Sequence, residues 1–186
     1  MIRKLPNIIT TVRLILSFVF VYFFIQGMNL EALVVFIIAS ISDAVDGWLA
    51  RKLKITSKFG ENFDPLADKI LTISAFVAFA IQDIVVFWMV AIIIFRDIFT
   101  TVLRYLFFTE NKIPTSKSAK FKTTIQFVFI ISILLLRIFS DYLQSEIFDK
   151  ILQSEIIYWL MFSITVLTVW TMIEYVLQLL KHKKKK

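Results

Sequence analysis

Four aspartates stand between two apolar runs of the chain, within the stretch SDAVDGWLARKLKITSKFGENFDPLADK at residues 42–69. They form two pairs with helical spacing, Asp43 with Asp46 and Asp64 with Asp68. Residues three or four positions apart share one face of a helix, so each pair is expected to project together from a helix end. Because the connecting segment is short, the two helices are expected to be antiparallel neighbours whose carboxylates face each other.

Carboxylates gathered in this way repel one another unless a cation neutralises them. Hard divalent ions prefer oxygen ligands, and Mg²⁺ or Mn²⁺ fits a set made only of carboxylates. The chain has no cysteine, and its one histidine, His182, lies in the terminal KHKKKK. That composition excludes a thiolate zinc site and argues strongly against a Ser-His triad. Four carboxylates leave room for two ions, the arrangement that phosphoryl chemistry uses.

The composition places these carboxylates in a membrane protein. Of the 186 residues 59% are hydrophobic, 20 are Phe and only 3 are Gly, whereas a soluble domain is about half apolar. We expect an all-α integral membrane protein, with one catalytic domain over residues 1–180 and a basic tail at 181–186. Its six transmembrane helices are expected at roughly 5–25, 30–50, 61–82, 84–108, 121–139 and 156–180.

The basic residues are concentrated on one side of this layout. Alternate connections carry Arg51, Lys52, Lys54 and Lys58, and then Lys112, Lys117, Lys120 and Lys122, whereas the others hold only Lys150. Basic loops stay in the cytoplasm, so both termini are expected there. The net charge of +7 is therefore explained by basic residues on the cytoplasmic side of the membrane, and no nucleic-acid partner is expected. Ionisable groups at membrane depth are costly and usually face water, which predicts a polar cavity open to the cytoplasm.

The span from Asp43 to Asp68 resembles the signature of the CDP-alcohol phosphatidyltransferases, D-x2-D-G-x2-A-R-x8-G-x3-D-x3-D, at every fixed position and spacing. The resemblance implies six transmembrane helices and a homodimer. With the positions of the basic residues, we expect a location in the bacterial cytoplasmic membrane with the active site facing the cytoplasm. It also implies a reaction. A hydroxyl group of an acceptor attacks the lipid-side phosphorus of a CDP-linked lipid such as CDP-diacylglycerol, and CMP leaves.

The same resemblance implies roles for individual residues. Asp43, Asp46 and Asp64 would be ligands of the two metal ions, and Asp68 would be the general base that also touches the second ion. The positions that match the family's contacts with the CDP-lipid are Asn7, Gly47, Arg51 and Ser57. For Asn7 a purely structural role is an equally good interpretation, because asparagine near a helix start is a favourable cap.

The acceptor is indicated by three further segments. LPNIITTVR, FDPLADKIL, and RDIFTTVLRYL with the later SAKFKTTIQ resemble the branch of the family whose acceptor is sn-glycerol 3-phosphate. An anionic acceptor needs cationic residues that CDP does not occupy. The candidates at the cytoplasmic ends of the fourth and fifth helices are Arg96, Arg104, Lys120 and Lys122. Alternatively, Arg96 only forms an ion pair with the adjacent Asp97. Arg104, Lys120 and Lys122 would then be ordinary basic residues of the cytoplasmic loops.

Two other functions stay open at this stage. The same reaction could use inositol phosphate or, with less support, serine, which does not require a phosphate pocket. A cation transporter could instead bind its ion with intramembrane aspartates, and would show ion flux without release of CMP. Transporters often contain inverted repeats; this sequence shows none, and its carboxylates cluster on one helical hairpin.

Overall fold

The computed structural model of the protein describes residues 5–53, 58–107 and 117–183, and within them the side chains of residues 11–42, 69–103, 118 and 120–180. These ranges contain helices and no strand. The helices are α1 (Leu5–Ile25), α2 (Asn29–Leu53), α3 (Lys58–Ile81), α4 (Phe87–Phe107), α5 (Lys117–Leu143), α6 (Glu146–Leu152) and α7 (Glu155–Lys183). Six of them coincide with the six predicted apolar stretches, so the predicted all-helical class is confirmed.

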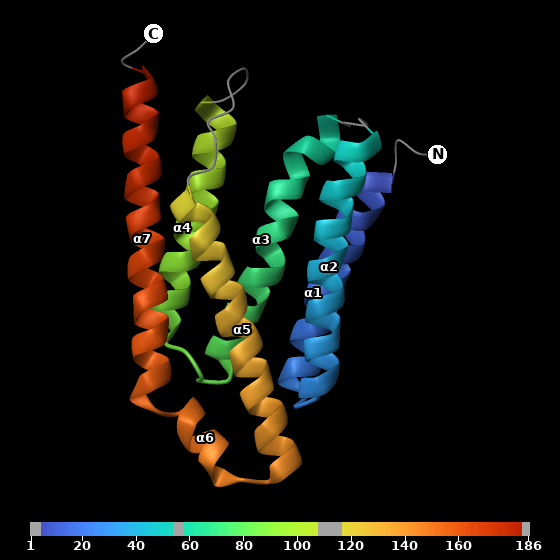
Figure 1. Ribbon diagram of the computed structural model, residues 1–186, viewed down its shortest axis with the longest axis vertical. Coiled ribbons are helices and arrows are strands. Elements are labelled where there is room, and N and C mark those ends of the chain that lie inside the picture. The colour runs from blue at the N-terminus through green and yellow to red at the C-terminus, as the bar shows by residue number, and fades with distance from the viewer. Residues whose placement is uncertain (1–4, 54–57, 108–116, 184–186) are drawn as a thin grey trace.

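The long helices run alternately up and down one bundle (Figure 1). The start of α1, the end of α2, the start of α3, the end of α4 and the end of α7 lie together at one end, here called the motif end. The short turns from α1 to α2 and from α3 to α4 lie at the opposite end with α6. Helix α1 packs on α2 and α3, α7 packs on α4, and α5 contacts α2, α3 and α7.

The short helix α6 was not predicted, because residues 140–155 read as a polar outer connection. Seven residues are too few to give a transmembrane hydropathy signal, and tertiary contacts hold the helix instead. Ser140 Oγ donates to Asp149 Oδ1 at 2.8 Å, and the rings of Phe139 and Phe148 stack at 5.9 Å. Leu152, at the end of α6, is buried.

Aromatic rings fill the interior away from the motif end. Phe76 on α3 stacks on Phe129 of α5 with ring centroids 6.2 Å apart, and it meets Phe79 edge-on at 6.5 Å. Phe24 of α1 also contacts Phe79, at 5.1 Å. Offset and edge-on aromatic pairs contribute beyond the area that they bury. These contacts join α1, α3 and α5 around one apolar core.

Polar side chains face inward over much of the bundle, and large apolar side chains face outward. Phe95, Phe87 and Trp170 are exposed by 61%, 72% and 66%, whereas Arg96, next to Phe95, is exposed by only 8%. Two stretches, Lys120–Leu143 and Glu146–Leu180, are long and apolar enough to cross a membrane. The described part of the chain is therefore compatible with a membrane protein whose outer surface meets lipid.

Replacing Phe76 with Ala should lower the thermal unfolding midpoint of the detergent-solubilised protein. The change leaves a cavity between α3 and α5, where the ring contacts Phe79 and Phe129, and such cavities cost about 3–5 kcal/mol in soluble proteins. The matched control is Phe87→Ala, since that ring is 72% exposed. Equal loss of stability in both variants would contradict the assigned core.

Candidate functional site

The two aspartate pairs lie on helices, as their spacing predicted. Helix α2 continues through Asp43 and Asp46, and α3 includes Asp64 and Asp68. The two helices contact each other, and the end of α2 and the start of α3 lie at the motif end (Figure 1). The side chains of the four aspartates are outside the described residues, so their roles as metal ligands and base stay predictions.

The predicted CDP-lipid contacts also fall at the edge of the described part of the chain. Gly47 and Arg51 belong to α2 and Asn7 to α1, but only their backbone is described. Ser57 is outside the described residues altogether. The helical backbone places Arg51 two turns after Asp43, near the end of α2. That position keeps it at the motif end with the aspartates.

The donor set fits a divalent metal site. Among the described side chains no three His, Cys, Asp or Glu gather into a group that could hold an ion. The four aspartates of the motif are the candidate ligands predicted from the sequence, and their side chains are outside the described residues. They would supply only carboxylate oxygens, the chemistry that Mg²⁺ and Mn²⁺ prefer.

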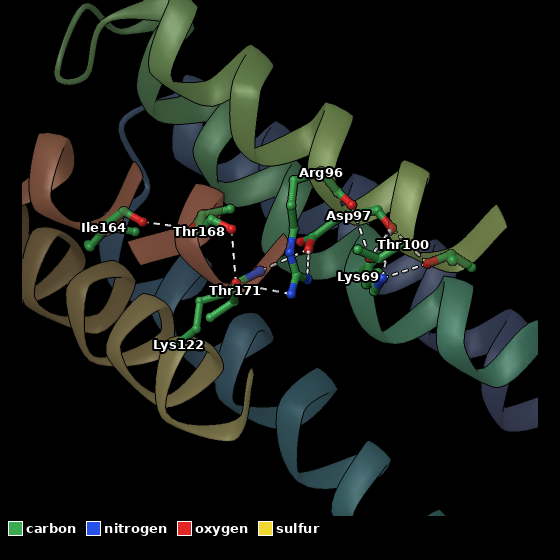
Figure 2. Close-up of polar contacts among 9 residues, drawn as sticks. Lys69, Arg96, Asp97, Thr100, Lys122, Ile164, Thr168 and Thr171 are labelled. Atoms are coloured by element: carbon green, nitrogen blue, oxygen red, sulfur yellow. Dashed lines mark hydrogen bonds and ion pairs between the residues drawn. The ribbon is translucent and has the colours of Figure 1, made fainter. Parts of the chain in front are cut away.

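A buried charge cluster joins α4, α5 and α7, and its centre is the carboxylate of Asp97 (Figure 2). Arg96 Nη1 donates to Asp97 Oδ1 at 2.7 Å, and Lys122 Nζ donates to the same oxygen at 2.8 Å. All three side chains are buried. In the described residues no Cα atom of α4 lies within 8 Å of one in α5. The long side chain of Lys122 therefore bridges two helices whose backbones do not touch.

Helix α7 fixes the other side of the arginine. Arg96 Nη2 donates to Thr171 Oγ1 at 3.1 Å, and Thr171 Oγ1 in turn donates to the backbone oxygen of Thr168 at 2.9 Å. Both threonines are buried, as is Thr165 one turn earlier. Of these three hydroxyl groups, the structure shows that of Thr171 in contact with the guanidinium of Arg96, and this contact links α7 to α4.

Lys69 connects the cluster to the helix of the aspartates. This residue directly follows Asp68 on α3, and its Nζ donates to the backbone oxygen of Asp97 at 2.8 Å and to Thr101 Oγ1 at 2.5 Å. Figure 2 shows the lysine reaching from α3 to α4. The end of the motif and the charge cluster are therefore neighbours in space, which the sequence alone did not show.

Two cations of the cluster share one carboxylate. Arg96 and Lys122 both donate to Asp97 Oδ1, so among the described side chains neither has a carboxylate of its own. The expected Arg96–Asp97 pair exists, and Lys122 adds a second positive charge beside it. Two buried cations on one carboxylate give a local surplus of positive charge, which favours binding of an anion.

Two of the four predicted acceptor contacts come together here. Arg96 and Lys122 share Asp97, whereas Lys120 is exposed on α5 and the side chain of Arg104 is outside the described residues. Lys69 and Thr171 were missed. Lys69 was visible within FDPLADKIL as a family-like residue, but no sequence signal connected Thr171 to Arg96.

The chain was also compared with known proteins. The sequence profile of the CDP-alcohol phosphatidyltransferases matches residues 3–173. A protein of Cereibacter sphaeroides named CDP-diacylglycerol–glycerol-3-phosphate 3-phosphatidyltransferase is 37% identical over 135 residues, 68% of this chain and 61% of that protein. Proteins of the same name from Bacillus subtilis and Rickettsia typhi are 33% and 32% identical over 71% and 89% of this chain. The aligned regions cover 77% and 93% of these two proteins.

The chain belongs to the CDP-alcohol phosphatidyltransferase family, because the profile spans nearly its whole length. The resemblance inferred from the aspartate motif is thereby confirmed. The family is membrane-associated, in agreement with the two long apolar stretches of the described residues.

Replacing Asp97 with Asn should strongly destabilise the protein. The change leaves Arg96 and Lys122 buried without their carboxylate, and breaking a buried ion pair in this way costs about 3–5 kcal/mol. The measurement is thermal or denaturant unfolding in detergent. Lys122→Met should cost less stability in the Asp97→Asn background than in the parent, because the second change removes one uncompensated charge. Strictly additive effects would show that the two side chains do not interact.

Proposed function

We propose that the protein transfers a phosphatidyl group from CDP-diacylglycerol to sn-glycerol 3-phosphate, giving phosphatidylglycerophosphate and CMP. Membership of the family, with its full signature from Asp43 to Asp68, is the observation that carries the reaction type. The names of the three relatives support the choice of acceptor. The reaction is a step of phospholipid biosynthesis.

In this proposal the hydroxyl oxygen of the acceptor forms a bond to the lipid-side phosphorus of CDP-diacylglycerol. The bond from that phosphorus to the bridging oxygen of the diphosphate breaks, and CMP leaves. Asp68 takes the proton of the hydroxyl group. Asp43, Asp46, Asp64 and Asp68 would hold two Mg²⁺ or Mn²⁺ ions, which supply charge neutralisation at the diphosphate and lower the pKa of the hydroxyl group.

The remaining contacts of the nucleotide lipid follow the motif. Arg51 would pair with the diphosphate, because a guanidinium matches phosphate oxygens with two parallel hydrogen bonds. Gly47 would allow the lipid substrate to approach the α2 backbone. Asn7 and Ser57 would complete the contacts to the CDP group.

The charge cluster is the proposed site for the acceptor's phosphate. Glycerol 3-phosphate must be held by its phosphate so that its hydroxyl end, not its phosphate, reaches the reacting phosphorus. Arg96 on α4 and Lys122 on α5 supply buried positive charge, and Lys69, next to Asp68 on α3, donates to the backbone of α4. The helix of the proposed base is thus in direct contact with the helix of Arg96. Arg104 and Lys120 stay predictions as further contacts.

We also propose a six-helix integral membrane enzyme with its active site on the cytoplasmic side of the bacterial inner membrane. The motif end holds both the start of α1 and the end of α7 (Figure 1), and Lys52, Lys58 and Lys117 lie at helix ends beside its connections. Basic residues at these positions favour the cytoplasm. A catalytic domain over residues 1–180 with a lipid-binding tail at 181–186, and a homodimer, complete the proposal.

The reaction is tested by measuring CMP release from CDP-diacylglycerol with glycerol 3-phosphate, inositol phosphate and serine as separate acceptors. Glycerol 3-phosphate should be the fastest, and EDTA should abolish the release. Asp43→Asn, Asp46→Asn and Asp64→Asn should each be inactive while still purifying as folded proteins. Full turnover in EDTA would refute the metal site, and faster release with serine would refute the acceptor. Ion flux through vesicles without CMP release would indicate a transporter instead.

Removing one cation of the cluster should weaken use of the acceptor. Lys122→Met should lower kcat/KM for glycerol 3-phosphate about ten- to hundredfold, the effect of one lost hydrogen bond to a charged group. The KM for CDP-diacylglycerol should change little, because that substrate is held by Arg51 and the metals. The matched control is Lys150→Met, an exposed lysine of α6 with no proposed contact to either substrate, which separates general loss of positive charge from loss of this contact. Equal kinetics of the two variants would contradict the anion site.

A further inference from the structure

A buried amide nitrogen one turn after Lys122 has no hydrogen-bond partner among the described residues. Gln126 on α5 is 2% exposed, and its Nε2 atom has no hydrogen-bond partner among the residues that the structure describes. The same is true of Arg96 Nε. Buried polar groups are nearly always hydrogen-bonded, and leaving one unsatisfied costs about 1–3 kcal/mol. Both orphaned atoms are N–H donors, so the chemistry they lack is an acceptor.

The position of Gln126 follows from its neighbours on the helix. It lies one turn after Lys122, whose Nζ reaches Asp97 on α4, and three residues before Phe129, whose ring stacks on Phe76 of α3. Residues three or four apart are adjacent on a helix face, with Cβ atoms about 5–6 Å apart. Gln126 therefore lies between the charged layer and the aromatic core.

Helix α3 shows the same order of layers. Lys69 contacts α4 at the level of Asp97, buried Thr72 follows three residues later, and Phe76 then packs on Phe129. On α3 and α5, a buried neutral polar residue, Thr72 or Gln126, thus lies about one turn further from the motif end than the cation on the same helix. The stacked rings of Phe76 and Phe129 pack beyond these neutral residues, on the side away from the motif end.

We propose that the side-chain amide of Gln126 donates a hydrogen bond to the phosphate of the acceptor and forms the deep, neutral end of its binding site. The proposal rests on the proposed function and adds a residue to it. A phosphate has several acceptor lone pairs and can take up the Gln126 and Arg96 donors at once. The surplus positive charge of the cluster selects an anion over a neutral hydroxyl group. A neutral donor at the deep end adds a contact without adding another buried charge, which would cost more to desolvate.

The experiment compares two acceptors in two proteins. Gln126→Met keeps the length of the side chain and removes the donor, and glycerol keeps the hydroxyl groups of glycerol 3-phosphate and lacks the phosphate. The variant should lose about ten- to hundredfold in kcat/KM for glycerol 3-phosphate, mainly through KM. It should keep the parent's kcat/KM for glycerol and its KM for CDP-diacylglycerol. Equal losses with both acceptors would mean that Gln126 serves only the fold, and would overturn the proposal.

A second measurement covers the case in which CMP release with glycerol is too slow to follow. Inorganic phosphate should inhibit the parent in competition with the acceptor, and its inhibition constant should rise in Gln126→Met by the same factor as the KM. An unchanged inhibition constant would overturn the proposal. The matched control is Gln153→Met at an exposed glutamine, which should behave like the parent. If the parent releases CMP only with another acceptor, the proposed function fails, and competition by inorganic phosphate still decides the role of Gln126.

Discussion

The carboxylate of Asp97 is the constraint on which the interior of the bundle depends. Arg96 and Lys122 both donate to its Oδ1 atom, and Lys69 donates to its backbone oxygen. Through these contacts one residue holds α3, α4 and α5 together, and the bond from Arg96 to Thr171 adds α7. Buried charges are tolerated only where they are paired and hydrogen-bonded. The positions of these four helices around the cluster are therefore set by electrostatics as well as by packing.

The side chains inside the bundle change from polar to apolar along its length, and the charge cluster lies at the polar end. Near the cluster the inward side chains are charged or hydroxylated, and beyond Gln126 they become phenylalanine rings. An apolar core that consists of rings from α1, α3 and α5 gives rigidity at the end away from the motif. The apolar core thus lies at the end of the bundle away from the motif, and the charge cluster lies between this core and the motif end.

Much of the secondary structure could be predicted from the sequence. Each of the six apolar stretches is a helix, and the aspartate pairs lie on the two helices that their spacing required. Helix α6 was missed because its stability depends on Ser140, Phe139 and the burial of Leu152, none of which appears in a local pattern. For the site, Arg96 and Lys122 were predicted from their charge and depth alone. Lys69, Thr171 and Gln126 were not. Lys69 and Gln126 lie within the family-like segments FDPLADKIL and SAKFKTTIQ, but no local signal gave either of them a role, and none connected Thr171 to Arg96.

The sequence by itself determined the family and the reaction type, because the residue types and spacing of a catalytic motif are local properties of the chain. It also determined which segments are helical, because apolar runs of this length must satisfy their backbone hydrogen bonds internally. Only the tertiary structure decided that Lys122 and Arg96 share one carboxylate, and that Gln126 lies below them without a partner. Lys122 and Asp97 are 25 residues apart and Arg96 and Thr171 are 75 apart. Contacts at such separations depend on how the helices pack, and no spacing rule in the sequence encodes them.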